Sequence, residues 1–374
     1  MNYFKVRQRQ LQKSLQEQDA SHILVNNLPN IYYLTGIKYL EGDTWDIVLL
    51  CAQDDDPILY VPRMLAEQIS FLLPKETNVE ICILDGGKKY VDLINSMVSK
   101  EAILLFEDGV VTYREYRMLS EKLSAKLQPA GSAIENIRIV KDKLEIQCIK
   151  KAVSLTEQTL QEVTQHIFEN DPVTYNELDV VELINSFSKD MGGEGVGFDS
   201  IVASGMGSSI PHYSPRSKQI SNDILLLDLG IKYDGYSGDI SRTYLGPKAT
   251  KEMKDMYKIV REAHYDAINM VKPGRTMFEI HSKVIEIFKK HGVEKNFIHS
   301  IGHGLGLDMH EQPFVSRKNE SIELKENMVI TIEPGLYFEG KFGIRIEDVL
   351  VVTNSGADSL SNHSTINENK FVIK

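Results

Sequence analysis

An N-terminal α/β domain followed by a larger domain made of two related halves is the fold that this sequence predicts. Three observations support it. The chain has 374 residues, which is longer than most single domains. Its first part alternates short apolar runs with amphipathic segments, a pattern typical of layered α/β domains. Its second part repeats a helical segment, a loop and an apolar strand that ends in an acid.

The N-terminal domain is predicted over residues 1–132. Strands are expected in "HILV", "WDIVLLC", "PILYV", "VEICIL" and "AILLF", and helices in "RMLAEQISFLL", "YVDLINSMV" and "TYREYRMLSEKL". The phrase "NIYYLTGI", Asn30 to Ile37, is interpreted as a strand that enters a glycine turn, because its aromatic and branched residues favour strands. No catalytic cluster is evident in this domain.

The second domain is predicted over residues 133–374 and begins with a long helical pattern from Ile137 to Phe168. Beyond it the chain resembles itself. "VTYNELDVVELINSF" matches "RTMFEIHSKVIEIF", which sets Glu177 against Glu279, and "ILLLDLG" matches "VITIEPG", which sets Asp228 against Glu333. We therefore expect two halves related by a pseudo-twofold axis, with a functional cleft between them.

Composition excludes several classes of protein. A formal net charge of −11 argues against a nucleic-acid or anionic-membrane surface. No apolar run approaches the ~20 residues of a membrane span, and the N-terminus lacks a signal-peptide core, so a cytoplasmic protein is expected. The three cysteines, Cys51, Cys82 and Cys148, are widely spaced in apolar surroundings, which favours buried thiols over disulfides or metal ligation.

A first acidic hairpin is predicted in "ILLLDLGIKYDGYSGDISRTYL". Asp234-Gly235 favours a type I′ turn, and a hairpin centred there places Asp228 opposite Ser241 and Asp239 opposite Gly230. Asp228 and Asp239 then share one face of the hairpin as diagonal neighbours, with Cα atoms ~7–8 Å apart. Their carboxylates can therefore converge.

A second acidic hairpin is predicted in "MVITIEPGLYFEGKFGIRIEDVLVV", where a connection centred on Gly340 places Glu333 opposite Glu347. Burying an acid after an apolar run is costly unless its charge is compensated. Two divalent cations would neutralise the four carboxylates of the two hairpins, and a neutral imidazole would fill a further position. This balance predicts a two-metal centre in which the oxygen-rich ligands favour Mn or Co, with Zn or Fe as alternatives.

A glycine-rich segment, "IGHGLGLDMHEQP", contains His303 and His310. Together with "LLLDLGIKYDGYSGDISRT", "TIEPGLY" and "GIRIED", it resembles the pita-bread metallopeptidases of the prolidase and aminopeptidase P group, and the resemblance covers essentially the whole chain. It implies a creatinase-like α/β domain followed by an α+β pita-bread catalytic domain. The metal ligands that it implies are Asp228, Asp239, His303, Glu333 and Glu347.

The resemblance also implies metal-assisted hydrolysis of the Xaa-Pro bond in a homodimer, with proline-containing dipeptides or short peptides as substrates. The residues implied to act beside the metals are His212, His299, His310, Tyr337 and Arg345, with Glu333 as both ligand and base. His310 would contact the developing oxyanion, and Arg345 and Tyr337 would orient ligand and intermediate. For His299 and His310 the alternative is a supporting role, in which they hold metal-binding groups in place.

Two departures from the family pattern bear on the substrate. Phe314 stands where many prolidases have an arginine that binds the substrate carboxylate, with Arg317 as a substitute, and Gly207 replaces the usual asparagine. An Xaa-Pro dipeptidase is therefore the favoured function, and an Xaa-Pro aminopeptidase acting on longer peptides is the alternative. A metal-free creatinase-like hydrolase or a non-catalytic relative fits less well, because all five ligand positions are occupied. A methionine aminopeptidase would usually lack the N-terminal domain.

Overall fold

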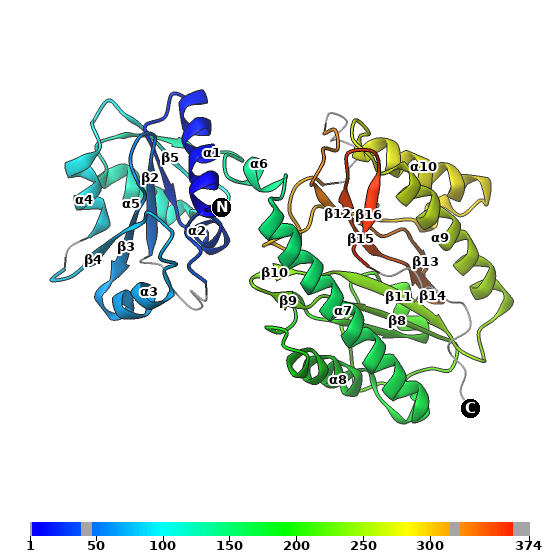
Figure 1. Cartoon of the computed structure of the whole chain (residues 1–374). Helices are drawn as coiled ribbons and strands as arrows, with labels where there is room; N and C mark the ends of the chain where they lie inside the picture. Colours follow the sequence, from blue (N-terminus) through cyan, green and yellow to red (C-terminus); the bar gives the residue numbers. More distant parts are fainter. Residues whose placement is uncertain (1, 39–46, 88, 315–321, 362–374) are drawn as a thin grey trace. The chain divides into compact units, whose positions relative to one another are not determined.

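A computed structural model describes residues 2–38, 47–87, 89–314 and 322–361 of the chain (Figure 1). The chain divides into two compact units, Met1–Arg138 and Ile139–Lys374. Among the described residues, no helix combines the length and the apolar character that crossing a bilayer requires. The long helical pattern after Ile137 is confirmed as α7 (Lys143–Glu169), which belongs to the second unit.

The first unit is an α/β domain around a mixed six-stranded sheet with the order β4-β3-β2-β1-β5-β6. Its strands are β1 (His22–Val25), β2 (Val48–Ala52), β3 (Ile58–Pro62), β4 (Glu80–Leu84), β5 (Ile103–Phe106) and β6 (Lys126–Pro129). Its helices are α1 (Tyr3–Glu17), α2 (Leu28–Thr35), η1 (Arg63–Leu65), α3 (Ala66–Leu72), α4 (Tyr90–Met97), α5 (Tyr113–Lys122) and α6 (Glu135–Arg138). The strands predicted from the apolar runs are confirmed, and β6 is an additional one.

The prediction of a strand in "NIYYLTGI" is wrong, because most of this segment forms α2. Pro29 lies in the first helical turn, where its missing N–H costs nothing. The amide of Asn30 donates to Glu107 and Glu135, at 2.6 and 3.0 Å, and these contacts hold the helix from its polar side. Gly36 ends the helix at φ 77°, a backbone conformation that glycine adopts readily. Tertiary contacts thus override the strand propensity of the tyrosines and isoleucines.

The second unit is an α+β domain whose described strands form two three-stranded and two two-stranded sheets, with helices packed around them. Its helices are α7, η2 (Pro172–Thr174), α8 (Glu177–Asp190), η3 (Gly205–Ser209), α9 (Lys251–Met270), α10 (Met277–Lys290) and η4 (Glu294–Asn296). Its strands are β7 (Ile201–Ser204), β8 (Ile224–Leu229), β9 (Lys232–Tyr233), β10 (Tyr236–Ser237), β11 (Ile240–Leu245), β12 (Val329–Ile332), β13 (Gly335–Phe338), β14 (Phe342–Arg345), β15 (Asp348–Val352) and β16 (Ala357–Ser359). In Figure 1, α7 runs beside α8, and α9 packs against α10.

The internal repeat is visible in how the two halves pair their strands. In the first half, β7 pairs antiparallel with β8. In the second half, the segment 301–303 takes the same place beside β12, because Thr331 N–H donates to the His303 carbonyl at 2.8 Å and Glu333 N–H donates to the Ile301 carbonyl at 2.7 Å. The loop histidine is therefore attached by backbone hydrogen bonds to the strand that carries Glu333.

The repeat also extends to the helices, with one correction to the alignment. Capping boxes start α8 at Asn176 with Asp179 and α10 at Thr276 with Glu279. Because a capping box sets the first turn of a helix, Asp179 corresponds to Glu279. The predicted match of Glu177 to Glu279 is wrong by two residues, and Glu177 has a different set of contacts.

The predicted hairpin registers are confirmed. Asp228 pairs with Ser241, and Asp234 and Gly235 both have positive φ, at 50° and 77°, as a type I′ turn requires. In the second hairpin, Ile332 pairs with Asp348 and Gly335 pairs with Arg345, so Glu333 lies across from Glu347. Turn chemistry and alternation alone were sufficient to predict these pairings.

The type I′ turn leads to a stability prediction. In Gly235→Ala, a residue with a Cβ must adopt the left-handed backbone conformation that Gly235 has at φ 77°. This strain lowers the free energy of unfolding by about 1 kcal/mol. We expect a lower melting temperature with unchanged metal affinity. Gly109→Ala, at a position without positive φ where an added Cβ meets nothing within 4 Å, is the matched control. Equal melting temperatures for the two variants would contradict the assigned turn.

Candidate metal centre

The four acids of the two hairpins lie at strand ends that meet in the interior of the second unit. Asp228 is in β8 and Asp239 directly precedes β11, whereas Glu333 follows β12 and Glu347 precedes β15. The hairpins are joined because Glu347 N–H donates to the Ser241 carbonyl at 3.1 Å, and Thr243 exchanges two hydrogen bonds with the Arg345 backbone, at 2.9 and 3.1 Å. These contacts bring acids from separate hairpins to one place.

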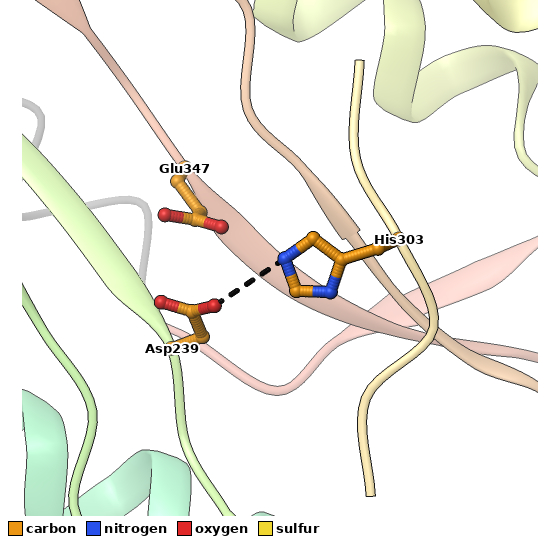
Figure 2. Close-up of side chains that lie close together, drawn as sticks. All are labelled: Asp239, His303 and Glu347. Atoms are coloured by element: carbon orange, nitrogen blue, oxygen red, sulfur yellow. Dashed lines mark ion pairs between the residues drawn. The ribbon is translucent and has the colours of Figure 1, made fainter. Parts of the chain in front are cut away.

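His303 lies at the meeting point of three of these acids. Asp239, His303 and Glu347, all buried, each offer one ligand atom, and these atoms lie within 4.8 Å of one another (Figure 2). His303 Nε2 is 3.5 Å from Asp239 Oδ2 and 3.6 Å from Glu333 Oε1. One imidazole nitrogen surrounded by carboxylate oxygens is a donor set for a divalent transition-metal ion.

The glycines beside His303 allow the loop to lie directly against the strand. A Cβ on Gly302 would come within 2.0 Å of the Thr331 carbonyl oxygen, and one on Gly304 within 2.2 Å of the Gln312 carbonyl oxygen. His303 Nδ1 is 3.0 Å from the Gly304 carbonyl, which can only accept, so Nδ1 carries the proton. The lone pair of Nε2 therefore faces the acids. Burial, reinforced by His310, lowers the pKa of His303 to about 4 and keeps the ring neutral.

Burial makes the acids hard to ionise together. It raises the pKa of Glu333 to about 8, and it raises the pKa of Asp239 and Glu347 well above their ordinary values, with the neighbouring carboxylates adding to the shift. Asp228 Oδ1 is buried and has no hydrogen-bond donor among the described residues. Asp228 Oδ1 is thus free to bind a cation, and the neighbouring carboxyls would release their protons when a cation binds. Both features fit a metal site.

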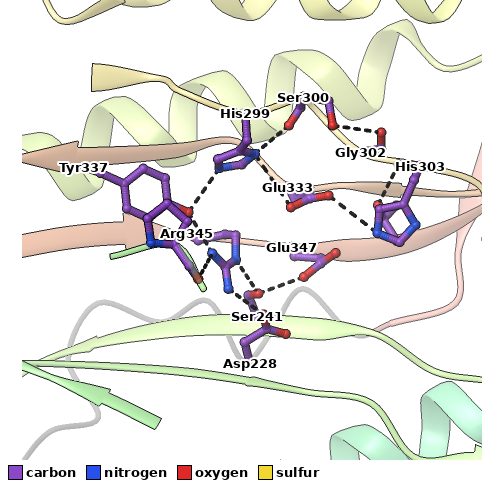
Figure 3. Close-up of polar contacts among 12 residues, drawn as sticks. Asp228, Ser241, His299, Ser300, Gly302, His303, Glu333, Tyr337, Arg345 and Glu347 are labelled. Atoms are coloured by element: carbon purple, nitrogen blue, oxygen red, sulfur yellow. Dashed lines mark hydrogen bonds and ion pairs between the residues drawn. The ribbon is translucent and has the colours of Figure 1, made fainter. Parts of the chain in front are cut away.

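Arg345 is the positive charge within this acid cluster. Its guanidinium forms an ion pair with Asp228 Oδ2 and donates to Ser241 Oγ at 2.8 Å and to Tyr337 Oη at 2.7 Å (Figure 3). Burial alone would lower the pKa of Arg345, but Tyr337 and the acids raise it well above its ordinary value, so the guanidinium stays charged. Arg345 orients Asp228 and leaves Oδ1 of that carboxylate available.

His299 extends the network on the other side of Tyr337. Its Nδ1 donates to the Ser300 carbonyl at 2.6 Å, so Nε2 must accept from Tyr337 Oη at 3.1 Å (Figure 3). Burial and the charge of Arg345 lower the pKa of His299 to about 3. A neutral His299, 3.8 Å from Glu333 Oε2, thus lies beside one of the predicted ligands without competing for the metal.

Ser241 and Thr331 are site residues that the sequence reasoning missed. Ser241 Oγ donates to Glu347 Oε2 at 2.7 Å while it accepts from Arg345, and Thr331 Oγ1 accepts from His303 N–H at 3.1 Å. The predicted register already placed Ser241 opposite Asp228, which was a usable signal. Thr331 gave none, because its role depends on the loop that packs against β12.

A cavity of about 650 Å³ opens onto the acid cluster. Its lining contains all five predicted metal ligands, together with His212, His299, His310 and Arg345. The His310 ring lies 4.3 Å from that of His303, centroid to centroid, and burial followed by the charge of His212 lowers the pKa of His310. Phe314 also lines the cavity and is 38% exposed, whereas Arg317 lies outside the described residues.

Comparison with known proteins identifies the family. Residues 147–354 match Metallopeptidase family M24, and residues 7–140 match the Creatinase/Prolidase N-terminal domain. The chain belongs to metallopeptidase family M24. The family and fold predicted from the sequence are therefore confirmed, and the M24 chain is a peptidase of a family that works with divalent metal ions.

Several relatives cover nearly the whole M24 chain. An Xaa-Pro dipeptidase of Pyrococcus furiosus is 32% identical over 96% of this chain and 98% of its own. The crystal structure of the prolidase from Pyrococcus horikoshii OT3 superposes with a TM-score of 0.86 at 29% identity and covers 98% of this chain and 100% of its own. That of an X-Pro aminopeptidase from Thermotoga maritima MSB8 has a TM-score of 0.81 at 30% identity, over 94% and 97%.

The raised carboxyl pKa values predict how stability depends on pH. From pH 6.5 upward His299 and His303 are neutral in the folded chain and at most half protonated in the unfolded chain, where their pKa is about 6.5, so the carboxyls dominate. Glu333, with its pKa raised by burial to about 8, holds a proton in the folded state that it loses when unfolded. The melting temperature of metal-free protein should therefore fall from pH 6.5 to 8, while the increase on adding Mn²⁺ should grow. A metal-free melting temperature that rises over this range would contradict the assignment.

Removing the Ser241 hydroxyl should weaken the centre without unfolding it. In Ser241→Ala, Glu347 loses a donor and Arg345 Nε loses an acceptor, and loss of such supporting contacts typically lowers metal affinity or activity by about 10- to 100-fold. Titration with Mn²⁺ and peptidase kinetics measure both. Ser188→Ala removes a buried hydroxyl that donates to the Asn185 carbonyl in α8 and should change neither. Equal behaviour of the two variants would exclude this role for Ser241.

Proposed function

We propose that the M24 chain is an Xaa-Pro dipeptidase with two divalent metal ions, Mn²⁺ favoured over Co²⁺, Zn²⁺ or Fe²⁺. The ligands would be Asp228, Asp239, His303, Glu333 and Glu347. The observation that carries this proposal is the convergence of buried acids from two hairpins on the neutral Nε2 of His303. Four ionised carboxylates with a fixed arginine require further positive charge, and the oxygen-rich donor set favours Mn²⁺.

The chemistry that bound divalent ions supply is carbonyl polarisation and a lowered pKa of water. The protein groups must then move one proton. Glu333, partly buried beside His299 and His303, accepts a proton from the attacking water and delivers it to the leaving proline nitrogen, which becomes a secondary amine. His310 and His212 face the same cavity, and an N–H of each ring donates to the developing oxyanion.

Proline in the second position of the substrate agrees with the cavity lining. An Xaa-Pro bond is a tertiary amide without an N–H, so recognition depends on contacts with the ring rather than on an acceptor for that group. The lining is rich in apolar side chains, which include Leu178, Val181, Phe198, Ile201 and Phe314. The relatives named as Xaa-Pro dipeptidase and prolidase support the same substrate class.

Cleavage of longer peptides is the second candidate. Arg345 is the only lysine or arginine among the described residues that line the cavity. Its guanidinium is already bonded to Asp228, Ser241 and Tyr337. Phe314 thus leaves the carboxylate of a dipeptide without an arginine at that position. The similarity to an X-Pro aminopeptidase also favours this alternative.

The cellular setting is part of the proposal. We infer a cytoplasmic homodimer that does not bind nucleic acid or membranes. The net charge of −11 supports the lack of nucleic-acid binding, and the three free cysteines are compatible with a reducing compartment.

A hydrolysis assay tests both the chemistry and the substrate length. After chelation the protein should be inactive, and Mn²⁺ or Co²⁺ should restore cleavage of an Xaa-Pro dipeptide. An Xaa-Pro-Xaa tripeptide assayed in parallel distinguishes the two candidates, and the same dipeptide with alanine in place of proline is the control. Cleavage of the tripeptide alone would reject the dipeptidase, and turnover that survives chelation would reject the metal mechanism.

A further inference from the structure

Glu177, at the first position of α8, is a fully buried acid that the proposed mechanism does not use. Three donors converge on its carboxylate. Ser204 N–H donates to Oε1 at 3.2 Å, while the Tyr213 hydroxyl and the Arg216 N–H donate to Oε2 at 2.9 and 3.0 Å. Lys218 Nζ adds a more distant ion pair at 3.9 Å. The carboxylate is therefore fully engaged, and both donors to Oε2 come from one loop.

That loop, residues 211–216, forms part of the wall of the cavity and carries His212. We call it the His212 loop. At its start, the Pro211 carbonyl accepts from Arg345 Nη1 at 3.3 Å, and Arg345 in turn holds Asp228. At Tyr213 the hydroxyl is held by Glu177. His212 thus lies between two anchored neighbours, one attached to the acid cluster and the other to α8.

The Tyr213 ring is also confined from the side. A Cβ on Gly207 would lie 3.0 Å from Tyr213 Cζ and 3.1 Å from Cε2, closer than side chains normally approach. The Arg216 guanidinium lies 5.8 Å from the centre of the ring. Gly207 therefore leaves the space that the tyrosine ring needs. Gly207 and Tyr213 complement each other in this chain.

We propose that Glu177 and Tyr213 form a clamp that sets the direction from which His212 faces the cavity. The inference rests on the proposed hydrolysis, because it assigns Glu177 and Tyr213 as positioning residues for a histidine that contacts the substrate. Neither residue touches the reacting atoms itself. The clamp acts through the backbone of the His212 loop, which has too few residues to change direction between its anchors.

Tyr213→Phe removes the hydroxyl and keeps the ring, so the protein should fold. We expect kcat/KM for an Xaa-Pro dipeptide to fall about tenfold, the size expected for losing one hydrogen bond to a charged group, with Mn²⁺ affinity unchanged. Tyr60→Phe is the matched control, because it removes a buried tyrosine hydroxyl that contacts Met97 in the other unit. Glu177→Gln should be worse than Tyr213→Phe, since an amide cannot accept on both sides.

A double-mutant cycle separates positioning from general destabilisation. If Tyr213 acts through His212, Tyr213→Phe should have little further effect on kcat/KM in a His212→Ala background. Additive losses would overturn the clamp.

Hydrogen exchange provides a readout that does not depend on activity. Exchange of the Arg216 amide should increase in Tyr213→Phe and stay unchanged in Tyr60→Phe. Unchanged exchange in Tyr213→Phe would also overturn the clamp. If exchange increases in Tyr213→Phe but the wild-type protein does not cleave Xaa-Pro peptides, only the proposed substrate is rejected.

Discussion

The mutual repulsion of buried carboxylates is the constraint on which the rest of the second unit depends. Asp228, Asp239 and Glu347 are almost fully buried and lie with Glu333 around one imidazole. Such a cluster is unfavourable in a low-dielectric interior unless protons or cations neutralise it. One permanent cation, Arg345, compensates part of the charge. The remaining charge explains why metal binding and folding should be coupled in this domain.

The surrounding structure restricts how each acid can relieve that repulsion. Arg345 and Ser241 hold one oxygen each of Asp228 and Glu347, which limits the rotation of both side chains. Carbonyl groups accept from Nδ1 of His299 and of His303, so Nε2 of each ring lacks a proton. Only His303 directs that nitrogen at the acids, since His299 uses it to accept from Tyr337. The same type of backbone contact thus prepares two histidines for different tasks.

The repeated halves explain how so many polar groups reach one point. Each half supplies a hairpin with two acids and a segment that pairs beside its first strand, β7 in one half and residues 301–303 in the other. The halves differ in what they add. The second half supplies the ligand histidine, and the first half supplies the His212 loop with its anchor on α8. A symmetric repeat of the backbone therefore carries an asymmetric site.

The sequence by itself determined the two hairpins, their registers and the acids that they deliver. These follow from local rules: Asp-Gly and Gly340 define the turns, and alternation along a strand assigns each side chain to a face. Local chemistry was sufficient at these places because the interacting residues are close in the chain.

Only the tertiary structure decided the contacts between segments that are distant in the chain. Asn30 is held by Glu107 and Glu135, and that anchoring makes "NIYYLTGI" a helix against its propensity. Arg345 meets Asp228, and Glu177 meets Tyr213, across separations that no local pattern encodes. Their energies depend on burial and on which donors arrive together, and both of these exist only after the chain has packed.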